Sequence, residues 1–363
     1  MKAKKPTLKE VAAQAGVSLS AASMILSERS GVSFSEDTIR RVIQAANELN
    51  YQRPKKFSLF ERPTILIFLT IVTGSYYTFI AQAVTQKADE AGYDTVILET
   101  HHSAEREKRL IHMAEHSGAQ GILFAAAPIN PREVQLLAKK IPTVIIQSGP
   151  HIPGMDTVTN DDTRVGQLAA THMLSLGHRH VAFMTIDRSW QKADNPSCMY
   201  AVKAAFAKVP DAVLSVYAAP GPDTLVPGSF HETRALGAKL AMEALKDEKL
   251  TGFICNTDYV AYGVMDTLSQ MGKRIPEDYS VCGCNNLFSS NLTGVSLTTV
   301  DRHPIQLGRA AFELLLNKMA ASSGKTIPTV THIEYLSELL IRKTTGIPRN
   351  QISKTMPRED EKP

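Results

Sequence analysis

The first fifty residues place apolar side chains at the spacing of short helices. In the first segment these are Leu8, Val11, Ala12 and Ala15. Thr7 and Glu10 form a capping-box pair at its start, and Gly16 stands where a helix that ends in a left-handed residue needs glycine. The pattern predicts a helix over residues 8–15 that ends in a tight turn.

Two more helices are expected before residue 50. Ser18 can cap the second, whose buried face would be Ala22, Ile25 and Leu26. Ser35 can cap the third, whose inner face is expected to carry Ile39, Val42, Ile43, Ala46 and Leu49. This order predicts a helix-turn-helix, in which the second helix enters the major groove of DNA. The outward side chains of that helix would be Leu19, Ser20, Ser23 and Met24. A three-helix module that binds another protein is the alternative.

From residue 64 onward, buried strands alternate with helices. Residues 64–72 form a continuous apolar run, which indicates a strand covered on both faces. The order of strand and helix recurs to about residue 321 and is followed by a strand-like segment over residues 331–345. This alternation predicts an α/β fold with parallel sheets, and two similar halves predict a bilobed body that closes on a ligand by hinge motion.

These patterns divide the chain into segments. They are a helix-turn-helix head (residues 1–52), a hinge (53–63), a body (64–345) and a tail (346–363). Within the body, the first lobe is expected to combine residues 64–159 with 301–321, and the second lobe 160–300 with 322–345. The tail is polar and contains proline, which predicts disorder.

The charge of the chain is unevenly distributed. The formal net charge is +4, but residues 1–63 carry eleven Lys and Arg against six Asp and Glu, a balance of +5. A basic head on a nearly neutral body is typical of nucleic-acid-binding proteins. A basic terminus that is merely solvated is the alternative.

Composition and motifs argue against several other classes. No apolar run reaches the ~20 residues that span a bilayer, and the first residues lack the apolar segment of a secretory signal. We therefore expect a cytoplasmic protein with no membrane partner. The four cysteines follow no zinc spacing, and neither a phosphate-binding glycine loop nor a Ser/His/Asp arrangement is recognisable. His112 and His116 match a metalloprotease pattern, but a solvated helix face is expected there. The sequence predicts no cofactor, no metal site and no enzyme.

Polar residues follow several predicted strands, and ligands of open α/β sheets bind beyond the carboxyl ends of strands. These residues are Thr73, Ser75, Tyr76, Asn160, Asp161, Asp162, Asp187, Arg188, Trp190, Asn256, Thr257, Asp258, Asn285 and Asn286. We expect them to converge between the two lobes. Asn and Asp at strand ends often only cap the next helix, which is the alternative for each of them.

The stretch TLKEVAAQAGVS (residues 7–18), together with NELNY (47–51), strongly resembles the DNA-binding head of the lactose/galactose-repressor family of bacterial transcription regulators. The resemblance extends over nearly the whole chain. It implies a homodimer that binds double-stranded operator DNA, and a periplasmic-binding-protein-like body of two doubly wound subdomains. A small-molecule effector would bind between the lobes and control the affinity for the operator. This effector would be a sugar, a nucleoside or a related metabolite, and the regulator is expected to be a repressor. A solute-binding receptor module without DNA function is the alternative, and an enzyme is a third.

The resemblance also assigns DNA contacts. Family members read bases from the two positions after the turn serine, here Leu19 and Ser20, and from an arginine whose place is taken by Met24. Apolar contact with a thymine methyl group is the expected substitute for the missing arginine. In the hinge, Leu59 or Phe60 would enter the minor groove, unless the aromatic side chains of this linker pack on the body. The expected DNA-binding residues are Thr7, Ser18, Leu19, Ser20, Ser23, Met24, Tyr51, Arg53, Lys55, Lys56, Leu59 and Phe60.

Family segments in the body assign effector contacts in the same way. Asn285 stands where the family has an effector-binding aspartate, and Cys198 where sugar-binding relatives have an arginine. Both departures weaken the expectation of a common sugar, because an amide is neutral and both donates and accepts hydrogen bonds. The expected effector-binding residues are Ser75, Tyr76, Asp161, Trp190, Cys198, Thr257, Asp258, Asn285 and Arg302.

Overall fold

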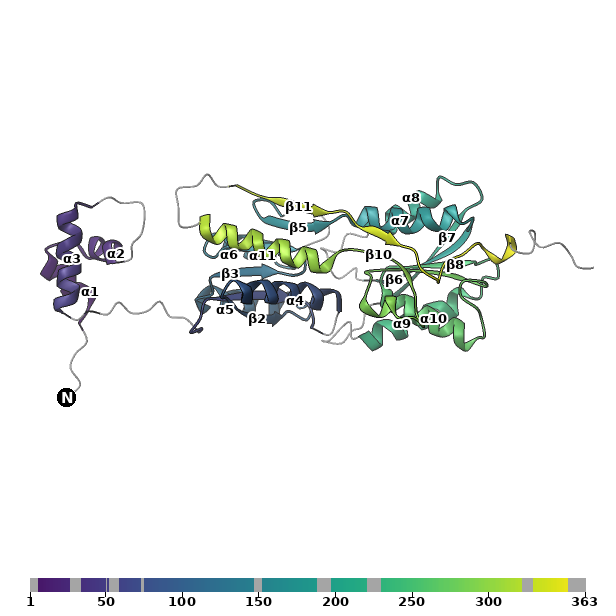
Figure 1. Cartoon of the computed structure of the whole chain (residues 1–363), viewed down its shortest axis with the longest axis horizontal. Coiled ribbons are helices and arrows are strands. Elements are labelled where there is room, and N and C mark those ends of the chain that lie inside the picture. The colour runs from purple at the N-terminus through teal and green to yellow at the C-terminus, as the bar shows by residue number, and fades with distance from the viewer. Residues whose placement is uncertain are drawn as a thin grey trace, which may run out of the picture.

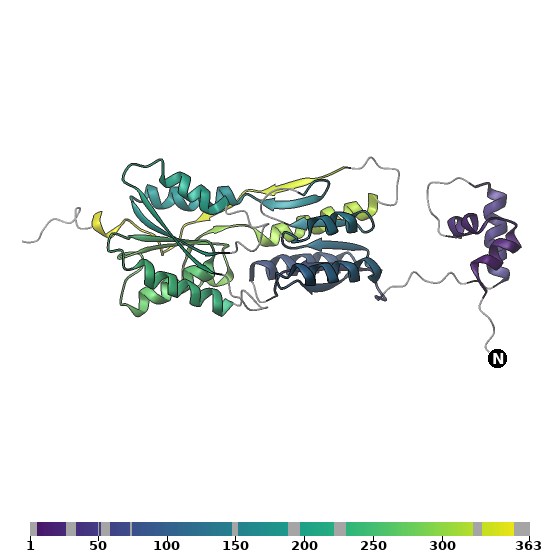
Figure 2. The same cartoon turned by 180° about the vertical axis from the view of Figure 1, so that it is seen from behind.

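The computed structural model describes residues 6–26, 34–49, 51, 59–72, 75–146, 152–187, 197–220, 230–321 and 329–351. Three helices come first, and strands alternating with helices follow in two sheets. Figures 1 and 2 show helices on both faces of each sheet. The predicted α/β architecture with an all-α head is therefore confirmed.

The head consists of α1 (Leu8–Ala15), α2 (Leu19–Leu26) and α3 (Glu36–Glu48). The Thr7 hydroxyl accepts from the Glu10 backbone N–H, and the Glu10 carboxylate accepts from the Thr7 backbone N–H. Gly16 has a φ of 66° and donates its N–H to the last carbonyls of α1. The predicted capping box and glycine turn are confirmed.

The inner face of α3 differs in part from the prediction. Its buried residues are Val42, Ala45 and Ala46, which pack with the apolar side chains of α1. Ile39 and Ile43, in contrast, are 36% and 48% exposed. Each residue of a helix is rotated by about 100° from the one before it, so Ile43 points away from the core that Val42 enters. Val42, Ala45 and Ala46 form the side of α3 that packs on α1, and the inward placement of both isoleucines was wrong.

The first sheet has the strand order β11-β5-β4-β3-β1-β2, with parallel pairing throughout. Its strands are β1 (Thr64–Leu69), β2 (Asp94–Glu99), β3 (Gly121–Phe124), β4 (Thr143–Ile146), β5 (Asp156–Asn160) and β11 (His332–Tyr335). On one face lie α4 (Ser75–Glu90) and α11 (Pro304–Ala321), and on the other α5 (Ala104–Ser117) and α6 (Pro131–Ala138). Strand β1 is buried along its whole length, as its unbroken apolar run predicts.

The second sheet has the order β12-β10-β9-β8-β6-β7, in which β12 alone runs antiparallel to its neighbour. Its strands are β6 (His180–Asp187), β7 (Val213–Pro220), β8 (Gly252–Cys255), β9 (Ser280–Cys284), β10 (Thr298–Asp301) and β12 (Glu338–Leu340). The helices α7 (Asp162–Ser175) and α8 (Ser197–Phe206) cover one face, and α9 (Phe230–Ala244) and α10 (Asp258–Gln270) the other. The short 3-10 helix η1 (Phe288–Asn291) follows β9.

Three crossovers connect the two lobes. They run from β5 to α7, from β10 to α11 and from β11 to β12. In the third, β11 pairs with β5 in the first sheet and β12 with β10 in the second, and Figure 1 shows this segment beside β5. The expected assignment of residues 322–345 to the second lobe therefore differs from the strand pairing. The edge of β5 would otherwise leave backbone groups unpaired, and β11 satisfies them.

The expected disorder of the tail does not begin at residue 346. The carbonyl of Gly346 lies 2.9 Å from Nε2 of the buried His178, and the Arg349 guanidinium lies 4.7 Å from the ring centre of Tyr279. Residues 346–351 thus pack on the second lobe, because buried polar groups there need partners. The rest of the tail lies outside the described residues.

Two expectations from composition can also be compared with the structure. Cys255, Cys282 and Cys284 are buried in the cores around the second sheet, as small apolar side chains. Across the described ranges, the helices are too short or too polar to cross a bilayer.

Candidate DNA-binding and effector-binding sites

The outward face of α2 is the part of the head that the sequence predicts to read DNA. Only Ala22 of this helix is buried. Leu19 is 51% exposed and Ser20 is exposed, whereas Ser23 and Met24 are half-buried. The capping hydroxyl of Ser18 accepts from the Ala21 backbone N–H at 3.2 Å. Leu19 and Ser20 are therefore the side chains of this helix that a base edge could reach most directly.

The remaining predicted DNA contacts in the head have structural roles as well. The Thr7 hydroxyl is engaged in the capping box with Glu10. Tyr51 is half-buried against the head core, and its N–H donates to the carbonyl of Ala46 at 2.8 Å. Both sites lie at helix ends, where a backbone phosphate could be contacted.

The hinge residues separate into two groups. Leu59 is 57% exposed, and its backbone N–H donates to the carbonyl of Ser117 at 2.8 Å. Phe60 is partly buried and packs on the α5 side of the first lobe. Of the two predicted minor-groove wedges, Leu59 is thus the exposed one, and the packing of Phe60 agrees with the alternative that linker aromatics cover the body. Arg53, Lys55 and Lys56 lie outside the described residues.

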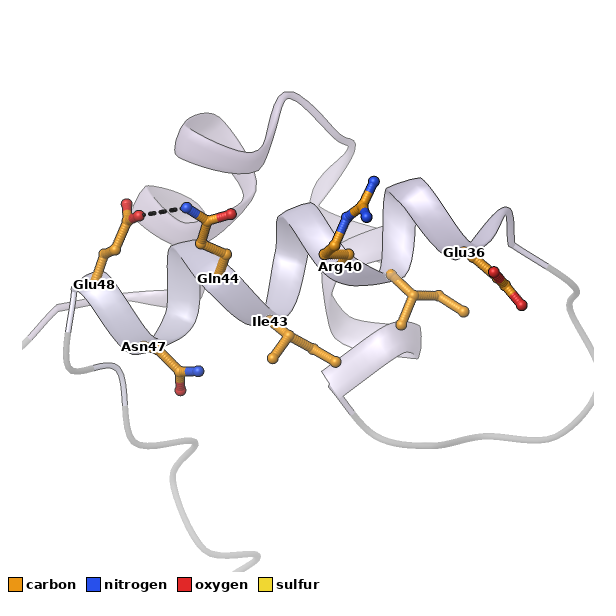
Figure 3. A pocket seen from close by; sticks show the side chains of 7 residues that line it. Glu36, Arg40, Ile43, Gln44, Asn47 and Glu48 are labelled. Atoms are coloured by element: carbon orange, nitrogen blue, oxygen red, sulfur yellow. Dashed lines mark hydrogen bonds between the residues drawn. The ribbon is translucent and has the colours of Figure 1, made fainter.

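A shallow surface hollow lies on the outer face of α3. Its lining residues are Glu36, Ile39, Arg40, Ile43, Gln44, Asn47 and Glu48. Figure 3 shows these side chains along one helix, with the other two helices of the head behind it. Gln44 donates to Glu48 at 2.8 Å within the hollow. It is formed by the exposed isoleucines and not by the predicted recognition face.

Several predicted effector residues meet where the first two crossovers leave their sheets. Arg302 forms an ion pair with Asp162, and its guanidinium carbon lies 5.8 Å from the ring centre of Tyr76. Asn160 donates its side-chain N–H to the Arg302 carbonyl at 3.0 Å and to the Tyr76 hydroxyl at 3.5 Å. Burial raises the pKa of Tyr76, so its hydroxyl stays neutral and can donate. Asp161 caps α7 by accepting from the Thr163 N–H at 2.7 Å.

Buried polar atoms without a hydrogen-bond partner among the described residues gather at strand ends and crossovers. They include Thr70 Oγ1, Asn256 Oδ1, Asn285 Oδ1, Arg302 Nε and Ser337 Oγ. Asn256 and Asn285 end the adjacent parallel strands β8 and β9, so their amide groups lie on one edge of the second sheet. Leaving such an atom unpaired costs about 1–3 kcal/mol. A ligand that donates N–H or O–H groups at this edge would remove that cost.

Asn285 is also held in an uncommon backbone conformation. Its φ is 123°, its side chain is 8% exposed, and its N–H donates to the carbonyl of Val300 at 2.9 Å. Neighbouring Asn286 has a φ of 49° and bonds through its amide to Asp301 and Arg342. The loop after β9 is therefore fixed by its backbone and by Asn286, which leaves the amide oxygen of Asn285 unused.

Asp258 is enclosed in the second lobe, contrary to the predicted effector contact. Its side chain is fully buried and accepts from the Leu287 N–H at 2.8 Å and from the hydroxyls of Ser290 and Thr299, each at 2.6 Å. Burial raises the pKa of Asp258, and these hydrogen bonds oppose the rise. Thr257 caps α10 through Val260, which turns the next side chain inward. The carboxylate of Asp258 therefore positions the loop that carries Asn285, and its oxygens are engaged within the second lobe.

Three other predicted effector residues have few described contacts or lie outside the described residues. Cys198 is half-buried near the start of α8, and its hydrogen bond to Cys284, together with burial, raises the pKa of the Cys284 thiol. Ser75 begins α4 beyond the carboxyl end of β1. Trp190 lies outside the described residues. Asn256 also follows a strand, and its position alone marks it as a candidate effector contact. Its side-chain N–H donates to the Thr185 hydroxyl at 2.9 Å, a contact that the sequence does not predict.

Residues 7–54 match the family model described as bacterial regulatory proteins, lacI family. Residues 62–215 match periplasmic binding proteins and sugar binding domain of LacI family, and residues 170–345 match a periplasmic binding protein-like domain. The matched ranges together cover the head and the whole body.

Individual proteins give the same result. The chain is 28% identical over 321 residues to the HTH-type transcriptional repressor PurR of Aliivibrio fischeri (strain ATCC 700601 / ES114), covering 86% of this chain and 91% of the relative. A LacI family transcriptional regulator from Enterococcus faecalis V583, solved with bound ribose, superposes with a TM-score of 0.64 at 21% identity, over 78% of this chain and 99% of that one. A Lacl family regulator from Silicibacter pomeroyi gives a TM-score of 0.67 at 19% identity, over 94% and 99%. The two structural likenesses bear on the fold alone.

Proposed function

The chain belongs to the LacI family of bacterial regulatory proteins, and from this we infer that it is a DNA-binding transcriptional repressor with a ligand-binding body. The observation that carries the inference is the α2 face, where Leu19 is 51% exposed on a helix whose turn and caps are complete. A large apolar side chain that is exposed at the start of a recognition helix can contact the methyl groups of thymine in the major groove. No enzymatic role is part of this proposal.

We propose that the operator is read mainly by Leu19 and Ser20. Each good base contact contributes about 1–3 kcal/mol of discrimination, which corresponds to roughly 5- to 150-fold in relative affinity. Half-buried Ser23 and Met24 would contribute at the edges of the contact, and Leu59 is the proposed wedge in the minor groove. Thr7, Ser18 and Tyr51 are proposed to position the helix against phosphates.

A gel mobility-shift or anisotropy measurement tests this proposal. The probe is the promoter DNA upstream of the chain's own gene, with a library of base changes in the bound half-site, measured over a salt series. Leu19→Ala and Ser20→Ala should change the preferred bases, while Gln44→Ala, on the outer face of α3, should not. A uniform loss of affinity on every sequence would refute base reading by these residues, and no specific binding by the wild type would refute the repressor function.

We further propose that a small metabolite binds at the strand ends between the lobes and controls operator affinity. The unpaired oxygens of Asn256 and Asn285 support a ligand that donates hydrogen bonds, such as a sugar, a nucleoside or a related metabolite. Tyr76, Asp161, Cys198 and Arg302 remain candidate contacts, as do Ser75, Thr257 and Trp190. Because one relative was solved with ribose, ribose and adenosine are sensible first probes.

A thermal-shift experiment with matched variants tests the ligand site. Asn285→Gly keeps the positive φ that Asn285 adopts and removes the amide, and Asp211→Gly makes a similar backbone change at an exposed residue with a φ of 58°. A probe that stabilises the wild type should lose its effect on Asn285→Gly and keep it on Asp211→Gly. An equal shift in both variants would place the ligand elsewhere.

Homodimerisation and a cytoplasmic location complete the proposal. Large apolar side chains are exposed on both lobes, among them Ile97 at 41% and Phe288 at 74%, which supports a protein interface. A dimer would place two α2 helices on the half-sites of a near-palindromic operator. Light scattering after gel filtration measures the mass, and a monomer at micromolar concentration would contradict this part of the proposal.

A further inference from the structure

Three side chains with metal-binding atoms meet where the second and third crossovers pass each other. Asp301 ends β10, His303 follows it in the crossover to α11, and Glu338 begins β12 directly after the crossover from β11. One ligand atom from each of them lies within 4.8 Å of those of the other two. We propose that this cluster binds a divalent transition-metal ion of the zinc class and so links the two crossovers.

Strand pairing brings the two carboxylates together. In the antiparallel pair of β10 and β12, Asp301 lies directly opposite Glu338. Like charges at opposite positions of an antiparallel pair are destabilising. The nearby guanidinium groups are used elsewhere, since Arg302 pairs with Asp162 and Arg342 donates to Asn286 and Leu297. Within the described ranges, neither carboxylate has an ion pair with Lys or Arg, so a bound cation would relieve their repulsion.

The donor set and its geometry suit zinc. Zinc in proteins takes imidazole nitrogen and carboxylate oxygen at about 2.0–2.2 Å, and a tetrahedron of that size places its ligand atoms about 3.4 Å apart. Nδ1 of His303 already lies 3.7 Å from Oδ1 of Asp301. The carboxylate of Glu338 lies within 4.8 Å of both atoms, and an exposed side chain can adjust to complete the set without disturbing the core. A fourth position remains for water.

Hydrogen bonds hold Asp301 in place before any ion binds. One carboxylate oxygen accepts from the His303 backbone N–H at 2.7 Å, and the other from the Asn286 side chain at 2.8 Å. Asn286 is itself oriented by Arg342 at 2.7 Å. Such partners orient a ligand and increase its affinity for metal.

A separate observation shows that polar groups of the third crossover are still unsatisfied. The hydroxyl of Ser337, directly before Glu338, is in a side chain only 1% exposed and has no hydrogen-bond partner among the described residues. Unpaired buried hydroxyls commonly bond an ordered water or ion. The crossover that carries Glu338 therefore holds a buried hydroxyl that is open to a water or ion.

The test is zinc binding by the full-length protein after treatment with a chelator. Zn²⁺ is titrated in competition with a fluorescent zinc indicator, for the wild type and for His303→Gln and Glu338→Gln. Two controls are Glu334→Gln, an exposed carboxylate on β11, and His116→Gln, which breaks the exposed histidine pair on α5. We expect each ligand variant to bind at least ~10-fold more weakly, and both controls to stay within about twofold of the wild type.

A second measurement does not depend on the folding of any variant. Co²⁺ added to the wild type should give the intense visible absorption of a tetrahedral site, and excess Zn²⁺ should remove it. The proposal is overturned by a wild type that binds neither ion, by ligand variants that bind as tightly as the wild type, or by a loss of binding confined to His116→Gln. The last result would assign the ion to α5. None of these results affects operator binding by α2, so the repressor function is tested separately.

Discussion

Replacing His178 should remove a pH dependence from the stability of the second lobe. This imidazole is fully buried, with Nδ1 2.8 Å from the Thr251 hydroxyl and Nε2 2.9 Å from the Gly346 carbonyl. It joins the start of β8 to the segment that follows β12. Burial is the main cause that lowers the pKa of His178 from 6.5 to about 4.

The direction and size of the effect follow from that shift. Between pH 4 and 6.5 the unfolded chain binds a proton at His178 that the folded chain excludes, so stability rises with pH across this window. The contribution is fully present above pH 6.5 and is lost as the pH falls toward 4. A shift of this size corresponds to about 3 kcal/mol in total, of which about 2 kcal/mol is lost between pH 7 and pH 5.

Urea unfolding at pH 7, 6 and 5, followed by circular dichroism, measures this loss. His178→Gln should be less stable than the wild type at pH 7, because it disturbs buried hydrogen bonds, but the difference should shrink by about 2 kcal/mol at pH 5. The exposed His116→Gln variant is the control and should keep the slope of the wild type. Glu107 and Asp258, whose pKa values burial raises, contribute equally to all three proteins. A slope for His178→Gln as steep as that of the wild type would show that His178 is not held neutral.

Two further changes test the packing of the second lobe. Asp258→Asn should lower the free energy of unfolding by about 3 kcal/mol, because it presents an amide N–H to donors that now bond a carboxylate; Asp211→Asn, at an exposed site, should change it by less than ~0.5 kcal/mol in the same urea assay. A ligand response that disappears without this loss of stability would restore a direct effector role for Asp258. Gly263→Ala should cost about 1–3 kcal/mol, because the added methyl group would lie 2.0 Å from the Arg234 carbonyl where α9 and α10 cross; a thermal melt equal to that of the wild type would mean that the two helices separate freely.

Local signals predicted the parts of the fold that depend on neighbouring residues. The Thr7–Glu10 capping box and the Gly16 turn depend only on residues in or next to α1. The unbroken apolar run of β1 indicates burial on both faces without reference to any particular partner. The errors came where a distant partner decides. Ile39 and Ile43 fit a helical apolar stripe, but the side of α3 that packs on α1 buries Ala45 beside the predicted Val42 and Ala46 and leaves both isoleucines exposed. Periodicity along one helix does not show which side of its apolar stripe another helix will cover.

The same limit applies to the site. Strand-end position predicts that Asn160 and Tyr76 lie together, because parallel strands end at one edge, and the family resemblance adds Arg302, which contacts both of them. It does not distinguish Asn285, whose amide oxygen is unpaired, from Asp258, whose carboxylate is enclosed by three donors. The difference arises from η1 and β10, which fold over Asp258 from about thirty to forty residues away. A single sequence does not show which strand-end carboxylate will be covered in this way.

Two neighbouring residues, Asn285 and Asn286, connect the proposed effector site to the proposed metal site. Asn285 carries the unpaired oxygen at the end of β9, and Asn286 orients Asp301 at the second crossover. Both residues have positive φ, and hydrogen bonds of Asn286 to Asp301 and Arg342 fix this loop. An ion that fixes Asp301 should therefore change the affinity of Asn285 for its ligand, and linkage requires the ligand to change zinc affinity by the same factor.

Calorimetric titration of whichever probe stabilises the wild type, with and without saturating Zn²⁺, measures that factor. We expect about 5- to 150-fold in the wild type, the usual range for coupled sites, and a factor near one in Glu338→Gln. Equal probe affinities in the wild type, with zinc bound and without, would mean that the Asn285–Asn286 loop does not connect the two sites.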